Sequence, residues 1–218
     1  MNGKLIVLEG LDGSGKSTQL ELLRSRLSGD AVYVKFPAYE SESSALVRMY
    51  LAGEFGTNPN DVNAYAASAF YAVDRYASFK TDWGKAYLEG ATVVCDRYAT
   101  SNAVHQASKL IGDERDTYLD WLYDFEFNKL GIPKPDAVIY LDMPIEVSQK
   151  LMSGRYEGDE GKKDIHERDT AYLEHCRKAA LYAADRLGWN VIACADGGNV
   201  RTREAIADDV FAAVKAVL

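Results

Sequence analysis

The residues best suited to chemistry in this sequence form one continuous run near its start, from Gly10 to Thr18. They read GLDGSGKST and match G-x-x-x-x-G-K-[ST], a loop that cradles the phosphates of a nucleoside triphosphate when it joins a strand to a helix. Its glycines let backbone N–H groups converge on phosphate oxygens. Lys16 would place a positive charge on the β- and γ-phosphates, and the Ser17 hydroxyl could bind Mg²⁺. The residues expected to bind the nucleotide are Gly10, Gly13, Ser14, Gly15, Lys16, Ser17 and Thr18.

A second candidate for phosphate chemistry is the pair Asp96-Arg97, which directly follows the apolar run at 92–95. Ligands of α/β proteins bind at the carboxyl ends of the strands, where this pair would lie. Asp96 could hold the hydration shell of Mg²⁺, and Arg97 could present a planar fork to a second phosphate group. A structural ion pair at a strand end is the alternative.

Two helical spacings add residues that could recognise a nucleotide. Tyr71 and Arg75 are four positions apart, so ring and guanidinium lie on one helix face, where one could stack on a base while the other donates to it. Asn102, His105 and Gln106 also share a face. The alternatives are an ordinary buried aromatic residue for Tyr71 and a solvated polar face for the second group.

A scaffold of alternating strands and helices must position these residues. Short apolar runs typical of strands occur at 5–8, 31–36, 92–95, 137–141 and 190–194, and helical patterns lie between them. Such an alternation favours a parallel sheet that is covered on both faces. We therefore predict an α/β fold, a three-layer sandwich with a parallel five-stranded sheet flanked by helices, of P-loop NTPase type, in a single domain over residues 1–218.

The composition sets limits on the partners. The 218 residues are 47% hydrophobic and 27% charged, and 25 basic against 33 acidic residues give a net charge of −8. This average field disfavours polymeric nucleic acid and anionic membranes. No stretch approaches the ~20 apolar residues of a membrane span. Cys95, Cys176 and Cys194 have no metal-binding spacing, and we expect buried, reduced thiols in a cytoplasmic protein.

Taken in order, these residues resemble the thymidylate (dTMP) kinases, a family of P-loop nucleoside monophosphate kinases. The P-loop alone is generic, but the Asp-Arg-Tyr run and the sequence PKPD before a strand are much more specific. The resemblance covers essentially the whole chain and rests on the P-loop with Asp12, Phe36-Pro37, YAVDR at 71–75, Asp96-Arg97-Tyr98 through Gln106, and PKPD at 133–136. It implies that the chain uses ATP and Mg²⁺ to phosphorylate dTMP to dTDP.

The resemblance also implies roles for single residues. Asp12 would lie near the acceptor sugar and the transferred phosphoryl group, while Arg75 and Arg97 would grip the acceptor monophosphate. Tyr71 falls where the family usually has a phenylalanine stacked on thymine. Tyr39 matches a position near the acceptor phosphate.

Three further positions complete the expected acceptor site. Asn102 and Gln106 fall where the family reads the edges of thymine. His105 aligns with a position, often tyrosine, that crowds the sugar 2′ carbon and favours deoxyribose.

The metal and the oligomeric state are separate expectations. Ser17 and Asp96 are the expected contacts of Mg²⁺. Members of the family commonly form homodimers through helices.

Two departures from the family pattern stand out. One branch of the family carries an arginine inside the P-loop where this chain has Gly13. The family's lid usually reads Asp-Arg-x-Glu, whereas residues 164–167 read DIHE. We expect a lid at about 153–168, in which Arg155 clamps the donor phosphates as a fourth catalytic residue beside Lys16, Asp12 and Arg97. On composition alone, this segment also fits a solvated surface loop.

Other functions remain open at this point. A P-loop deoxynucleoside kinase would phosphorylate a hydroxyl group and would favour a carboxylate base, for which Glu9 is the candidate. A non-catalytic nucleotide-binding switch would carry the same P-loop. The residues do not rank dTMP against dUMP, because one methyl group and the volume of the pocket decide that preference.

Overall fold

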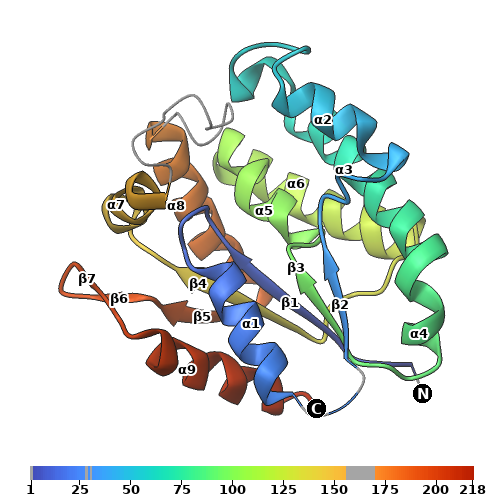
Figure 1. Cartoon of the computed structure of the whole chain (residues 1–218). Helices are drawn as coiled ribbons and strands as arrows, with labels where there is room; N and C mark the ends of the chain where they lie inside the picture. The colour runs from blue at the N-terminus through green and yellow to red at the C-terminus, as the bar shows by residue number, and fades with distance from the viewer. Residues whose placement is uncertain (1, 28, 30, 156–169) are drawn as a thin grey trace.

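A computed structural model of the chain shows a parallel five-stranded sheet between two layers of helices (Figure 1). The structure describes residues 2–27, 29, 31–155 and 170–218, except for the side chains of 153–155. The strand order is β2-β3-β1-β4-β5, and a short antiparallel hairpin, β6-β7, lies outside this sheet. The strands are β1 (Leu5–Gly10), β2 (Val32–Lys35), β3 (Val93–Asp96), β4 (Ala137–Asp142), β5 (Asn190–Ala193), β6 (Ala195–Asp196) and β7 (Asn199–Val200).

Helices connect the strands and include two π-helical stretches. The α-helices are α1 (Lys16–Arg26), α2 (Ala45–Leu51), α3 (Ala64–Ser78), α4 (Gly84–Leu88), α5 (Thr100–His105), α6 (Gly112–Tyr123), α7 (Ile145–Arg155), α8 (Thr170–Leu187) and α9 (Arg203–Lys215). The 3₁₀ turns are η1 (Glu42–Ser44), η2 (Pro59–Asp61) and η4 (Ala107–Lys109), and the π-helices are η3 (Phe79–Trp83) and η5 (Asp124–Lys129).

The predicted three-layer sandwich and the five predicted strands are confirmed. Every neighbouring pair in the large sheet is parallel, so all carboxyl ends meet at one edge. The register places Leu8 of β1 beside Asp96 of β3, and Gly10 beside Leu141 of β4. The P-loop and the Asp96-Arg97 pair therefore leave the sheet at adjacent positions on this edge.

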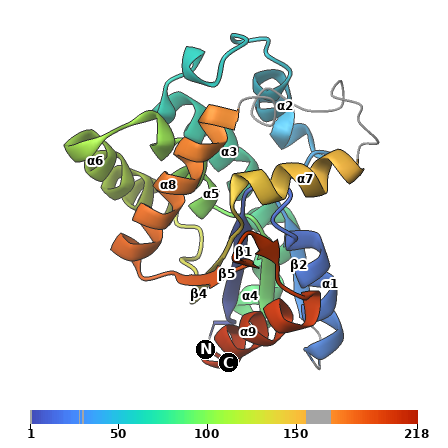
Figure 2. The same ribbon diagram turned by 90° about the vertical axis from the view of Figure 1, so that its left-hand side faces the viewer.

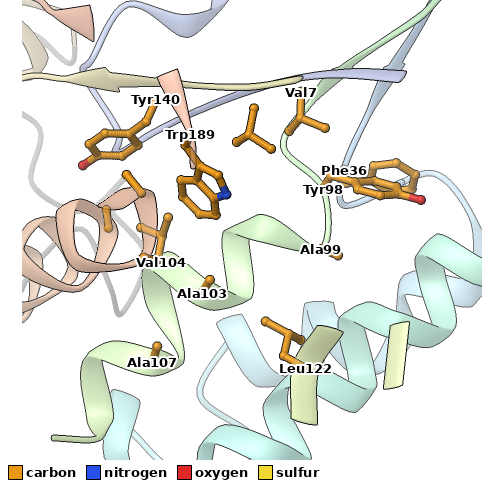
Figure 3. Packing of buried hydrophobic residues seen from close by; sticks show 14 of the residues in the cluster. Val7, Phe36, Tyr98, Ala99, Ala103, Val104, Ala107, Leu122, Tyr140 and Trp189 are labelled. Carbon is orange, nitrogen blue, oxygen red and sulfur yellow. The ribbon is translucent and has the colours of Figure 1, made fainter. Parts of the chain in front are cut away.

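The three central strands, β1, β3 and β4, are buried on both faces, which explains why they are almost continuously apolar. Leu5 and Val7 point into a core formed with α3, α5, α6 and α8, and part of that core is seen in Figure 3. Ile6 and Leu8 point the opposite way, into a core formed with α1, α7 and α9. Figure 2 shows these two helical layers on either side of the sheet.

The cysteines are buried, as expected from the sequence. Cys95, Cys176 and Cys194 all have free thiols in the structure. Among the residues that the structure describes, no helix combines the length and the apolar character needed to span a bilayer.

Candidate active site

The P-loop connects the end of β1 to the first turn of α1. Its predicted nucleotide-binding residues lie at the last position of β1, in the loop and in the first three positions of the helix. Gly15 precedes the helix with φ +91°, and Gly13 has φ +77°. Both values lie in the left-handed region that glycine adopts without steric cost. The loop thus ends at the N-terminus of an eleven-residue helix, whose free N–H groups could bind an anion.

Gly13 has a second reason to lack a side chain. A Cβ atom at this position would lie 2.9 Å from both Cγ of Met152 and the backbone oxygen of Ser148, which belong to α7. The close approach of α7 excludes any side chain here. In this chain the arginine that one family branch carries at this position would have no space.

Lys16 is held inside the loop. Its Nζ donates to the backbone oxygens of Gly10, at 2.8 Å, and Leu11, at 3.0 Å, and it lies 3.9 Å from the Asp12 carboxylate. Burial of the ammonium group, with the nearby charge of Arg97, lowers the pKa of Lys16 to about 8, even though Asp12 opposes the shift. The ammonium group is therefore charged at neutral pH, and phosphate would be a stronger partner than these carbonyl oxygens.

Oxygen ligands suited to Mg²⁺ lie next to the P-loop. Ser17 and Asp96 line the same hollow of about 320 Å³ between α1 and the end of β3. Oδ1 of Asp96 is buried and has no hydrogen-bond partner among the described residues, and the same holds for Oγ of Ser14 in the loop. Buried polar atoms without partners call for a bound group. A carboxylate and a hydroxyl beside a phosphate loop fit a magnesium–nucleotide complex.

Arg97 takes an unusual backbone conformation at the end of β3. Its φ is +68°, a left-handed value that is costly for a residue other than glycine and is found mainly at functional sites. Its backbone N–H donates to Leu8 of β1. Its Nη2 donates to the Asp12 carboxylate at 2.8 Å, and its Nη1 lies 3.2 Å from Nε2 of His105. The guanidinium group is thereby fixed between the P-loop and α5.

Asp12 and Arg97 each stabilise the charged form of the other. Burial alone would raise the pKa of Asp12, but the positive charges of Arg97 and Lys16 outweigh burial and hold that pKa well below its usual range. The negative charges of Asp12 and Glu9 likewise raise the pKa of Arg97 despite burial. Both side chains are therefore ionised at any physiological pH.

Glu9 has a different role from the catalytic base considered above. It is fully buried and is not among the residues that line the cavity described below. Its carboxylate accepts hydrogen bonds from Oγ1 of Thr100 at 2.6 Å, from Oγ of Ser101 at 2.9 and 3.0 Å, and from the backbone N–H of Tyr98 at 3.2 Å. Burial raises its pKa, against the influence of Arg97. Glu9 thus holds the turn that carries Arg97, a role signalled in the sequence only by a charge inside an apolar strand.

A cavity of about 200 Å³ lies beside Asp12 and Arg97 at the carboxyl edge of the sheet. The structure brings together here every residue predicted to bind the acceptor. Tyr98 and Ser101, which the sequence marked only as part of the Asp-Arg-Tyr run through Gln106, also line the cavity, as does Leu51, which the sequence did not single out. The lining residues are Asp12, Phe36, Pro37, Tyr39, Leu51, Tyr71, Arg75, Arg97, Tyr98, Ser101, Asn102, His105 and Gln106.

The cavity wall holds unused hydrogen-bonding atoms. Asn102 and Gln106 are only 2% and 1% exposed, yet Nδ2 of Asn102 and Oε1 of Gln106 have no partner among the described residues. Each buried, unsatisfied atom costs roughly 1–3 kcal/mol. A ligand that offers both a carbonyl oxygen and an N–H group would satisfy this donor and this acceptor.

Arg75 enters the cavity wall as one half of a buried ion pair. Its Nε donates to Oε2 of Glu126 at 3.2 Å, and its Nη2 donates to Oε1 of the same carboxylate. The neighbouring Asp74 accepts from the backbone N–H of Ala38 at 2.9 Å and from Oγ of Ser43 at 2.7 Å. These bonds tether α3 to the loop that carries Tyr39, whose side chain is 44% exposed.

One predicted site residue lies beyond what the structure describes. Arg155 is the last residue of α7, but its side chain, like the remainder of the expected lid through residue 168, lies outside the described residues. Of the other predicted cations in the described part of the chain, Lys16 and Arg75 are buried, whereas Arg97 is partly exposed.

Known proteins are similar to this chain in sequence and in fold. The sequence model of the family described as thymidylate kinase matches residues 8–201. Thymidylate kinase of Mycobacterium tuberculosis is 34% identical over 186 residues, which cover 82% of this chain and 84% of that protein. Thymidylate kinase of Plasmodium falciparum is 33% identical over 171 residues, covering 76% and 75%.

A solved structure supports the same fold. Thymidylate kinase from Candida albicans superimposes with a TM-score of 0.73 over 99% of this chain and 92% of that one, at 19% identity. At this identity the likeness concerns the architecture alone. The family match, however, begins in the strand before the P-loop and ends just after β7, and on that basis this chain belongs to the thymidylate kinase family.

Proposed function

We propose that this chain transfers the γ-phosphoryl group of ATP to dTMP, producing dTDP and ADP, and that the 200 Å³ cavity holds dTMP. The observation that carries this proposal is the position of the cavity. The cavity is lined by Asp12, which belongs to the P-loop, and by Arg97, which donates to Asp12. A phosphate in the cavity would therefore lie next to a triphosphate on the loop. Phosphoryl transfer depends chiefly on such positioning and on neutralisation of charge.

In this proposal the acceptor nucleotide lies across the cavity with its base away from the P-loop. The unpaired donor and acceptor of Asn102 and Gln106 match the carbonyl oxygen and N–H group on the edge of thymine. Tyr71 would stack on the base, and His105 and Tyr39 would border the sugar and the phosphate. Asp12 would lie near the sugar and the transferred group.

The donor site is the P-loop, with Lys16 on the transferred phosphates. Magnesium, when bound with ATP, would be held by Ser17 and by Asp96 through its hydration shell, and it would supply charge neutralisation at the phosphates. Arg97 adds a positive charge whose orientation is fixed by Asp12 and His105. Because the acceptor is already an ionised phosphate, this chemistry requires no general base.

The expected lid over 153–168, with Arg155 as its donor-phosphate clamp, remains part of the proposal. Closure of a charged lid would exclude water and strengthen each electrostatic contact in the site. Its support is the glycine-rich, charged composition of the segment and the resemblance to the family. Shortening it should lower kcat and increase wasteful ATP hydrolysis.

We also propose that the chain is a cytoplasmic homodimer that acts on small nucleotides and not on polymeric nucleic acid or membranes. Support for a helical interface comes from α3, where Val73 is 53% and Tyr76 is 38% exposed. Three buried, free thiols fit a reducing compartment. Sedimentation equilibrium of the wild type and of Val73→Glu would test the dimer.

The test of the activity is ADP release from ATP and Mg²⁺ with a panel of nucleoside monophosphates and with thymidine. We expect steady turnover with dTMP and none with thymidine, and the panel ranks dUMP against dTMP. Lys16→Met serves as the inactive control. Turnover with thymidine alone would indicate a deoxynucleoside kinase, and ATP binding without dTMP-dependent turnover would indicate a switch.

A further inference from the structure

We propose that Glu126 is a positioning residue for the acceptor site: its carboxylate fixes the guanidinium group of Arg75 so that the remaining Nη1 edge faces the bound nucleotide. This inference rests on the proposed function, in which Arg75 contacts the acceptor. Glu126 itself does not line the cavity and would act only through Arg75.

The contacts define one orientation of the guanidinium group. Arg75 is 2% exposed, Glu126 is fully buried, and 51 positions separate them in the sequence. Nε and Nη2 of Arg75 donate to different oxygens of the same carboxylate, which is the two-point fork that fixes both the direction and the plane of an arginine. Nη1 makes no hydrogen bond to any described residue, although Arg75 lines the cavity. One edge of the group is therefore available to a ligand.

Stability alone is a poor explanation for this pair. A buried ion pair loses much hydration energy, and apolar residues of similar volume are often as stabilising or more so. Glu126 also follows Leu122 by four positions, so it continues a buried apolar stripe that includes Leu119. An apolar residue would suit that stripe, whereas a carboxylate is required if a charged Arg75 must stay oriented at the cavity.

The segment that carries Glu126 is itself anchored to the cavity wall. Glu126 lies in the π-helix η5, a rare conformation that is frequent at functional sites. The next residue, Phe127, stacks on Tyr98 with ring centroids 6.4 Å apart, and Tyr98 lines the cavity directly after Arg97. The backbone oxygen of Glu126 also accepts from the N–H of Ile132 at 3.2 Å. These contacts hold the carboxylate at a set position relative to the acceptor.

The experiment compares Glu126→Gln and Glu126→Asp with the wild type and with Arg75→Lys. Gln keeps the shape of the side chain but removes its charge. Asp keeps the charge, but its side chain is one methylene group shorter, so the carboxylate lies farther from Arg75. We expect both variants to raise KM for dTMP by on the order of tenfold, while KM for ATP stays within about twofold. Lysine cannot form the fork, so Arg75→Lys should raise KM for dTMP similarly.

The double variant Arg75→Lys, Glu126→Gln decides whether Glu126 acts through Arg75. Positioning predicts no further rise in KM beyond that of Arg75→Lys, whereas independent roles predict that the two effects multiply. Multiplying effects, or an unchanged KM for dTMP in both Glu126 variants, would overturn the inference. If Glu126→Gln fails to fold, Glu126→Asp and the double variant Arg75→Lys, Glu126→Asp test in the same way whether Glu126 acts through Arg75. Failure of the wild type to phosphorylate dTMP would instead refute the proposed function.

Discussion

Asp12 and Arg97 are 85 positions apart in the sequence, yet an oxygen of the Asp12 carboxylate accepts from Nη2 of Arg97 at 2.8 Å. This contact joins the P-loop, which belongs to the donor side, to the strand end that borders the acceptor cavity. It exists because β1 and β3 are adjacent parallel strands whose carboxyl ends lie side by side. The position of the Arg97 charge is thus a consequence of the strand order.

Replacing Arg97 with glycine should lower the activity without lowering the stability of the fold. Arg97→Gly removes the guanidinium group and also relieves the left-handed strain at φ +68°. We expect kcat/KM for dTMP to fall at least about 100-fold, a loss of roughly 3 kcal/mol of transition-state stabilisation. Thermal unfolding should occur at or above the wild-type temperature. Arg97→Ala, which keeps the strain, is the matched control, and near-wild-type turnover in Arg97→Gly would remove Arg97 from the mechanism.

Replacing Glu9 should affect activity through Arg97. Glu9→Gln keeps the size of the side chain but places an amide group where the carboxylate accepts several hydrogen bonds, so about 1–3 kcal/mol of stability should be lost. Turnover should fall about tenfold, because the turn that carries Arg97 loosens. Thr100→Val, which removes one of these bonds, should have a smaller effect on both melting temperature and kcat. Complete loss of kcat with an unchanged melting temperature would instead place Glu9 in the chemistry.

Gly13→Ala should damage the P-loop more than Gly15→Ala. Both residues have left-handed φ values, and alanine at either one costs about 1–2 kcal/mol. At Gly13 the methyl group also meets Ser148 and Met152, whereas no atom of the described residues lies within 4 Å of a Cβ at Gly15. Urea unfolding should therefore show a larger loss for Gly13→Ala, together with a higher KM for ATP. Equal losses would mean that α7 moves aside without cost.

The pH dependence of ATP use should report Lys16. With a pKa of about 8, the ammonium group is charged below that pH and neutral above it, so kcat/KM for ATP should decline above pH 8. The unfolded chain keeps its lysine charged to about pH 10.4, so over this window it binds more protons and the contribution of Lys16 to stability rises with pH. Activity and stability therefore change in opposite directions.

Lys109 provides the control for this experiment. Burial also lowers its pKa to about 8, but it does not line the acceptor cavity or the P-loop hollow. Lys109→Met should leave the decline in kcat/KM for ATP unchanged while reducing the alkaline rise in stability. A profile that is flat up to pH 10 would show that Lys16 keeps an ordinary pKa in the free enzyme.

The sequence was sufficient for everything that depends on local pattern. Apolar runs predicted the five strands, and the P-loop pattern predicted a phosphate-binding loop between a strand and a helix, where β1 and α1 now lie. Parallel strands share one carboxyl edge, so Asp96-Arg97 could be expected near the P-loop. The residues that resemble the family's acceptor site also proved to line one cavity, although their individual roles stay predictions.

Tertiary structure alone decided how these residues are held. Glu9 and Glu126 carry no motif, and their significance depends on partners that lie 92 and 51 positions away, Ser101 and Arg75. The sequence suggested Glu9 as a possible base, but burial and its hydrogen bonds make it the anchor of the turn that carries Arg97. Local sequence specifies which conformation a segment takes, whereas packing of distant segments determines which charges meet. For this reason the sequence alone could predict the reaction of this chain, whereas only the fold could show which carboxylates bind its arginines.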